Sequence, residues 1–212
     1  AVAFSAADAA VPGYLPAGSA QACATVGLII AALIKSSQFP LSGLFLRSME
    51  GASPNSALGY AGISAHAGIV LLAGTMSIWG QFDWAHDVIA AIGALTVIQS
   101  TLIANVRADR KGGVASASSA TLGMLFIVIS QGYADAALLL SLGHAAFRMN
   151  QVVRAGGYIH DTIKWEEALG KSKIAPERTL DFVWQFGWAL NRLNSDYFRL
   201  PDFYANVDLK QK

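Results

Sequence analysis

Charge and cysteine are both scarce in this sequence, and the two shortages exclude several classes of protein. Only 14% of the 212 residues are charged and 54% are hydrophobic, with a mean hydropathy of +0.43. A soluble domain usually carries about 25% charged residues, so this composition indicates a membrane protein. The single cysteine, Cys23, lies in an apolar run, which excludes a disulfide framework within the chain and a cysteine-built metal site. The formal net charge of +1 gives no reason to expect nucleic-acid binding.

Patterns for bond-breaking chemistry are also missing. The sequence contains no metal-ligand cluster, no phosphate-binding loop and no nucleophile triad. We therefore expect no catalytic residues, no metal and no cofactor in this chain. The chain begins at Ala1 with a run of small residues, which is consistent with removal of a targeting peptide or with an upstream part outside the sequence.

Long apolar runs predict an all-α polytopic membrane protein with about five transmembrane helices. A helix needs about 20 apolar residues to cross a bilayer. We expect an N-terminal segment over 1–19, a membrane domain over 20–155, and a C-terminal helix with a docking tail over 156–212. The expected spans are 20–49, which is too long for one unbroken crossing, 57–78, 86–106, 114–130 and 134–155.

Basic residues gather at one set of span ends. These ends carry Arg47, Arg107, Arg110, Lys111 and Arg154, whereas the opposite ends of the spans carry only aspartates. Such an asymmetry follows the positive-inside rule. It predicts that the N-terminus faces the positive side of the membrane (lumen, periplasm or intermembrane space) and that the tail faces the negative side.

Beyond the spans, the sequence predicts an amphipathic helix from Pro176 to about Leu193, because proline suits the first helical turn. At helical spacing Val183, Trp184 and Trp188 share one broad apolar face. Such a helix could lie in the membrane interface with its tryptophans at headgroup depth, or pack against a partner subunit. The residues leave both interpretations open.

A lysine and a proline interrupt the first span. Lys35 stands near its centre, and the helix is expected to break between Ser36 and Pro40. An ammonium at membrane depth is energetically unfavourable and usually marks an ion or proton path. A break there exposes backbone groups that only a protein-lined or hydrated cavity can satisfy. The pattern indicates a transport element; the alternative is a lysine that snorkels to the surface or pairs with a neighbouring subunit.

The residues around this break resemble a known family. Residues 35–40 (Lys-Ser-Ser-Gln-Phe-Pro) and 49–58 (Met-Glu-Gly-Ala-Ser-Pro-Asn-Ser-Ala-Leu) resemble, without a gap, the signature of the antiporter-like membrane subunits. Residues 67–72, 108–118 and 144–148 resemble further motifs of that family in the same order. The family includes proton-pumping subunits of respiratory complex I and the photosynthetic NDH complex, Mrp-type antiporters and inorganic-carbon uptake relatives. The resemblance covers about 27–160.

The resemblance implies a proton path whose candidates are Lys35, Tyr60, His66, His144 and Arg148. Tyr60 follows the position where the family usually has a histidine, and His66 could replace it, be a satisfied buried histidine, or ligate a pigment magnesium. Arg148 stands where a titratable lysine is usual, and arginine effectively never gives up its proton. His144 and Arg148 share a helix face, although Arg148 could equally hold an anionic lipid or a partner carboxylate.

By this resemblance, the chain is expected to be a shortened proton-translocating module of an NADH/ferredoxin–quinone oxidoreductase, with other membrane subunits and lipids as partners. The location implied is a mitochondrial inner, thylakoid or bacterial plasma membrane. A family unit also contains a glutamate on an earlier helix and a lysine on a later one, so this chain is not expected to pump alone. One alternative is a scaffold subunit that has lost transport; another is part of an inorganic-carbon uptake module.

Overall fold

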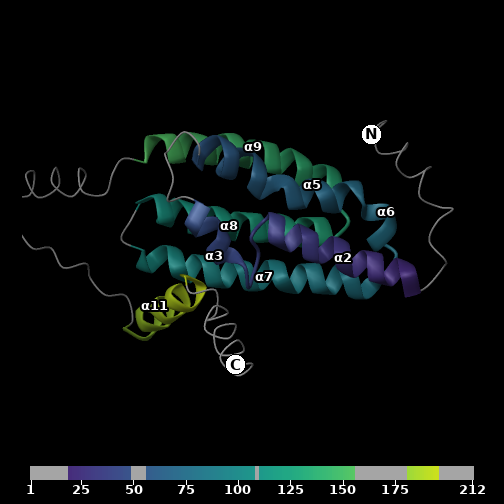
Figure 1. The fold of residues 1–212 in the computed structure, drawn as a ribbon, viewed down its shortest axis with the longest axis horizontal. Coiled ribbons are helices and arrows are strands. Elements are labelled where there is room, and N and C mark those ends of the chain that lie inside the picture. Colours follow the sequence, from purple (N-terminus) through teal and green to yellow (C-terminus); the bar gives the residue numbers. More distant parts are fainter. Residues whose placement is uncertain (1–18, 49–55, 108–109, 156–180, 196–212) are drawn as a thin grey trace, which may run out of the picture.

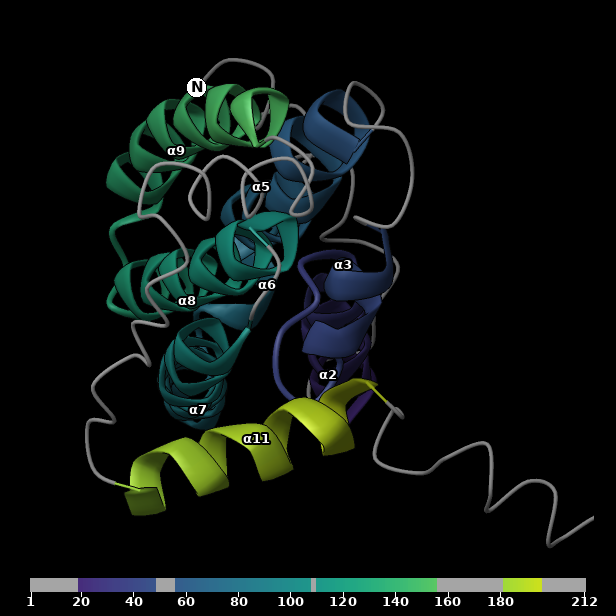
Figure 2. The same ribbon diagram turned by 90° about the vertical axis from the view of Figure 1, so that its left-hand side faces the viewer.

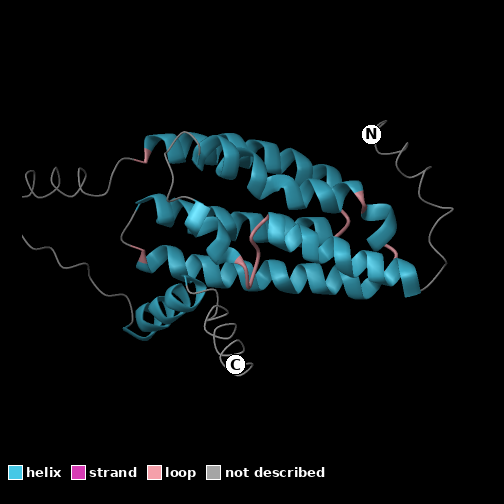
Figure 3. Cartoon of the chain, in the orientation of Figure 1, coloured by secondary structure: helices cyan, strands magenta, loops and turns pink. Residues whose placement is uncertain are grey.

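The structure, a computed structural model, describes residues 19–48, 56–107, 110–155 and 181–195 (Figure 1). Within these ranges every regular element is a helix (Figure 3). The all-α prediction is therefore confirmed. The predicted N-terminal segment up to residue 18, the motif residues 49–55, the segment 156–180 and the tail 196–212 lie outside the described residues.

The first predicted span forms two helices, α2 (Ser19–Lys35) and α3 (Ser42–Ser48). Between them Ser37 adopts a left-handed backbone conformation with φ of 47°. Pro40 has no backbone N–H and disfavours helical geometry at the residue before it, so α2 cannot continue through this point. The chain instead turns, with the Leu41 N–H donating to the Gln38 carbonyl at 2.6 Å.

The next stretch changes its helical geometry three times. A π-helix, η1 (Ser56–Ile63), is followed by the 3₁₀ turn η2 (Ser64–His66), and then by α5 (Ala67–Gly74) and α6 (Met76–Trp79). π-Helical segments are rare and occur frequently at functional sites. The sequence predicted one span over 57–78 and contained no sign of the π geometry.

Three long helices complete the bundle: α7 (Asp83–Val106), α8 (Arg110–Ser130) and α9 (Ala134–Arg154). They run side by side in Figure 1. The antiparallel pair α7 and α8 meets at two glycines, since a Cβ on Gly93 would lie 2.7 Å from the Gly123 carbonyl oxygen and the reverse holds equally. Small residues at such crossings let helix backbones approach closely in membranes.

Three described stretches are long and apolar enough to cross a membrane, namely Ser56–Gly74, Asp83–Val106 and Lys111–Ser130. A shorter apolar helix covers Gln21–Lys35. These spans agree with an integral polytopic membrane protein. The count of about five spans, which adds α9 and the broken first helix, stays a prediction.

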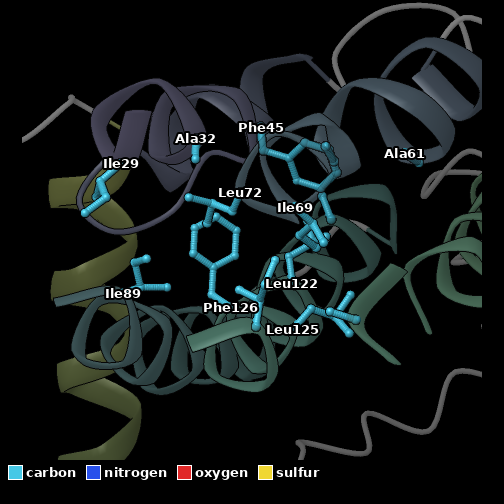
Figure 4. Close-up of a cluster of buried hydrophobic side chains, with 14 of the residues drawn as sticks. Ile29, Ala32, Phe45, Ala61, Ile69, Leu72, Ile89, Leu122, Leu125 and Phe126 are labelled. Atoms are coloured by element: carbon cyan, nitrogen blue, oxygen red, sulfur yellow. The ribbon is translucent and has the colours of Figure 1, made fainter. Parts of the chain in front are cut away.

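The core lies where α2, α3, α5 and α8 meet. Ile69 and Leu72 from α5 are fully buried, as are Leu122 and Phe126 from α8. Phe45 from α3 and Ala32 from α2 complete one side of this cluster (Figure 4). The core therefore fixes both halves of the broken helix against the long helices.

The last described helix, α11 (Asp181–Ser195), lies across α7 and α3, as Figure 2 shows with α7 and α8 seen nearly end-on. It ends two residues beyond the predicted Leu193. Its inner face is narrow: Gly187 and Asn194 are buried and Leu190 packs against the core. A Cβ on Gly187 would lie 3.0 Å from the Leu102 carbonyl oxygen, so glycine permits this close crossing.

Candidate functional site

Two histidines from different helices meet inside the bundle. His66 is the last residue of η2 and is buried, with 5% of its surface exposed. Its Nε2 lies 2.8 Å from Nδ1 of His144 on α9, and the two ring centroids are 5.1 Å apart. Two of the predicted proton-path residues are therefore brought into direct hydrogen-bond contact, 78 residues apart in the chain.

Arg148 extends this pair. It lies one turn after His144 on α9, and its Nε donates to His144 Nε2 at 3.1 Å. Its remaining nitrogens donate to Gln151 Oε1 at 2.7 Å, and to the Ala117 carbonyl oxygen and Thr121 Oγ1, both at 3.1 Å. Every guanidinium nitrogen is thus engaged, and the network joins η2, α9 and α8.

Two members of this network were missed by sequence reasoning. Gln151 stands three residues after Arg148, a spacing that places two residues on one helix face, and this signal was available in the sequence. Thr121 lies on a different helix, so only tertiary structure brings it to the arginine. The third partner is a backbone carbonyl, which has no side-chain signature.

The hydrogen bonds assign a direction to the network. His144 Nε2 accepts from Arg148, so the proton of neutral His144 resides on Nδ1 and is donated to His66 Nε2. His66 then carries its own proton on Nδ1, which is buried. The tautomer of each histidine is assigned from the hydrogen-bond partners of its two ring nitrogens. Donation therefore runs from Arg148 through His144 to His66.

This geometry bears on the pigment alternative for His66. One ring nitrogen is engaged by His144, and the other is buried. Neither nitrogen is presented at the surface, where it could ligate a pigment magnesium. More broadly, the described residues contain no group of three or more histidine, cysteine, aspartate or glutamate side chains able to hold a metal ion.

Lys35 makes no hydrogen bond to either histidine. It is the last residue of α2 and is exposed, and no hydrogen bond or ion pair joins its side chain to another group in the described ranges. Ser36 is buried and Pro40 exposed in the break that follows. Tyr60 belongs to η1, but the position of its side chain lies outside what the structure describes.

A second polar cluster surrounds the break. The Phe39 N–H donates to Thr96 Oγ1 on α7 at 2.9 Å, which satisfies a backbone group released by the interruption. Ser42 is the first residue of α3. Its Oγ donates to Asn194 Oδ1 on α11 at 2.8 Å and to Gln99 Oε1 on α7 at 3.4 Å. All of these polar side chains are buried. The cluster ties both sides of the break to α7 and ties α3 to α11.

Thr96→Val tests this anchoring. Valine has nearly the same shape but removes the acceptor, leaving the Phe39 N–H without its partner, so we expect a loss of about 1–3 kcal/mol in the free energy of unfolding. Thermal denaturation of the purified chain in detergent measures it. Thr101→Val is the matched control because Thr101 is exposed on the same helix. Equal effects of the two substitutions would contradict a specific role for the Phe39–Thr96 bond.

The sequence of the chain is similar to known protein families. A sequence model of the family described as "NADH:quinone oxidoreductase/Mrp antiporter, TM" matches residues 4–180. The chain belongs to this family. The predicted resemblance to the antiporter-like subunits is therefore confirmed, and the helix α11 begins just beyond the matched residues.

Similar members of the antiporter family include the chloroplastic NAD(P)H-quinone oxidoreductase subunit 5 of Mesostigma viride, 34% identical over 133 residues, or 63% of this chain. NADH-ubiquinone oxidoreductase chain 5 of Yarrowia lipolytica is 36% identical over 138 residues, or 65% of the chain. The chloroplastic subunit 5 of Gossypium barbadense is 31% identical over 165 residues, or 78% of the chain. The matches cover 20%, 21% and 21% of these relatives, so the chain spans about a fifth of their length. The relatives and the spanning helices together show an integral membrane protein of an energy-transducing membrane.

Proposed function

We propose that this chain is a membrane subunit of a multi-subunit quinone oxidoreductase and supplies part of a proton path through the histidine network. The observation that carries the proposal is the hydrogen-bonded series Arg148–His144–His66 inside a membrane bundle. Family membership supports it, because similar proteins are named subunits of NADH- and NAD(P)H-quinone oxidoreductases. Quinone reduction would take place on other subunits, and those membrane subunits are the expected partners.

The two histidines form the part of the path that can exchange protons. An imidazole can accept a proton on one ring nitrogen and release one from the other, so His144 Nδ1 can pass its proton to His66 Nε2 across 2.8 Å. Arg148 cannot release its own proton. It instead occupies the lone pair of His144 Nε2, so a proton can enter there only when the guanidinium moves aside. Arg148 would act as a gate rather than as a relay.

The path takes its orientation from the charge asymmetry of the spans. The described acidic residues Asp83, Asp87 and Asp135 lie at the starts of α7 and α9, while Arg107 and Arg154 lie at the ends of the same helices. We place the basic end on the negative side of the membrane and the N-terminus on the positive side. Protons would therefore cross between the acidic and basic ends of the bundle.

His144→Asn tests the relay. Asparagine keeps a hydrogen-bonding side chain but cannot be protonated, so we expect proton translocation through this subunit to fall by about 100-fold while the complex assembles normally. Purified complex in vesicles, with a pH-sensitive dye inside, reports translocation, and electron transfer is followed in parallel. The subunit's contribution is the difference from complex lacking this chain.

Leu142→Ala is the control for this experiment, because Leu142 is 71% exposed on the same helix and makes no contact in the network. It should leave translocation unchanged. If His144→Asn also leaves translocation unchanged in assembled complex, the relay is excluded.

A scaffold role is the second candidate, and the placement of Lys35 favours it. The signature lysine lies outside the network, and the network ends on an arginine. Under this hypothesis Lys35→Ala and His144→Asn both leave translocation intact, or abolish it only together with assembly. Native gel separation and mass spectrometry of the intact complex identify the partners: a partner chain carrying the glutamate and lysine helices that the resemblance implies favours a split proton channel, whereas its absence favours the scaffold.

A further inference from the structure

Helix α11 presents its aromatic residues outward. Its inner contacts involve Gly187, Asn191 and Asn194, together with Leu190, which packs against the core. The outer surface consists of large apolar side chains with substantial exposure: Phe182 76%, Trp184 42%, Phe186 47%, Trp188 37% and Leu193 40%. An ordinary water-facing helix would bury this aromatic side. The arrangement therefore fits an apolar or interfacial environment on the outside of α11.

The outer face borders a groove whose described lining includes one cationic residue, Arg192. It has a volume of about 720 Å³ and is lined by Trp184, Gln185, Trp188, Ala189, Arg192 and Leu193. The rings of Trp184 and Trp188 meet edge to face with centroids 5.9 Å apart. Arg192 is exposed, and no ion pair or hydrogen bond to another described residue engages its side chain. Apolar walls beside a guanidinium suit a ligand with an anionic head and an acyl chain.

The surroundings of α11 are complementary to an anion. Arg107, at the end of α7, donates to Asn191 of α11 at 3.3 Å, so the helix lies at the basic end of the bundle. Lys111 and Arg154 stand at the same ends of α8 and α9. The acidic side chains that the structure describes are all at the opposite end. An anionic group at the Arg192 end of α11 therefore meets the positive charge of Arg107 and its neighbours.

The orientation of α11 points to the membrane as the source of that anion. The helix lies crosswise to the spanning helices, against the side of the last turns of α7 (Figure 2), and a helix in the plane of the headgroups would have this orientation. Tryptophan is enriched at this depth because its ring is apolar and its N–H is polar. Basic residues beside a span attract anionic lipids.

We propose that the groove of Trp184, Trp188 and Arg192 binds an anionic phospholipid, with its phosphodiester on Arg192 and an acyl chain along the tryptophans. The site lies beyond the residues that match the antiporter family and requires no proton transfer, so it stands independently of the proposed function.

The test uses the full chain in nanodiscs of phosphatidylcholine, titrated with phosphatidylglycerol whose acyl chains carry bromine, a quencher of tryptophan fluorescence. We expect saturable quenching that brominated phosphatidylcholine does not produce at the same concentrations. Trp184→Phe with Trp188→Phe should remove most of the saturable signal while keeping the aromatic bulk. Arg192→Gln should weaken apparent affinity by about fivefold, the effect of one basic residue near an anionic surface.

Arg154→Gln is the matched control, since it removes one charge from the same end of the bundle outside the groove. If Arg154→Gln weakens binding as much as Arg192→Gln, the general field of the basic end attracts the lipid and the groove is not a site. A photo-crosslinker at position 188 in the intact complex provides the second readout. Capture of phospholipid supports the proposal; capture of another subunit in place of lipid overturns it and identifies the face as a protein interface.

Discussion

Replacing Arg148 by methionine is expected to lower the free energy of unfolding by about 3 kcal/mol, because hydrogen bonds to a charged group are worth about 1.5–3 kcal/mol each and part of this is offset by exposure. The substitution keeps much of the side-chain volume but removes the donors to His144, Gln151 and Thr121. The bond to Thr121, together with the bond to the Ala117 carbonyl oxygen, connects α9 to α8, so α9 should lose protection relative to the wild type. Thermal denaturation in detergent, with hydrogen exchange over α8 and α9, measures both effects.

Arg148→Lys separates the charge of this residue from its geometry. An ammonium retains the charge but cannot reproduce the planar fork that reaches four acceptors at once, so we expect it to recover no more than about half of the lost stability. Lysine can also release a proton, unlike arginine. If Arg148→Met were as stable as the wild type, the network would not hold α9 in place.

Gly68→Ala is expected to have an effect of similar size by separating α2 from α5. A Cβ on Gly68 would collide with the Ala32 carbonyl oxygen and the Ser36 hydroxyl; the hydroxyl can rotate away, but the carbonyl is backbone and cannot move without shifting α2 next to the break. Overpacking of this kind costs about 1–3 kcal/mol, occasionally more. Denaturation of the purified chain gives the stability, and a spin-label pair on α2 and α5 gives the displacement.

Gly27→Ala supplies the control, because Gly27 lies on α2 itself and a Cβ there meets nothing within 4 Å. It should be neutral or stabilising by up to about 1 kcal/mol, since alanine is the better helix former. If Gly27→Ala lowered the free energy of unfolding as much as Gly68→Ala does, the loss would reflect a general intolerance of α2 to added side chains. It would then not report the close contact at Gly68.

The sequence predicted those features that follow from local composition. Apolar runs predicted the helices, and Pro40 predicted where the first one is interrupted, because a missing N–H acts within a few residues. The four-residue spacing of His144 and Arg148 predicted a shared face, and the structure joins them by a hydrogen bond. Residue spacing could not predict which residues on other helices these side chains contact.

Tertiary contacts determine the remaining features. The hydrogen bond between His66 and His144 depends on how η1, η2 and α9 pack, and the π geometry of η1 has no recognised residue pattern. The packing of α11 shows the same limit. Its amphipathic pattern left open whether the helix lies in the membrane interface or packs against a partner subunit, and it did not predict that the face centred on Gly187 contacts α7 of the same chain.

The short helix α3 has only seven residues, too few to be stable by its own hydrogen bonds. Two of its first residues rest on α11: Ser42 bonds to Asn194, and Gly43 lies so close to the Asn194 backbone that no side chain fits between them. These contacts with α11 therefore stabilise α3. Loss of α11 would remove the contacts that hold the first residues of α3, leaving its packing in the core through Phe45.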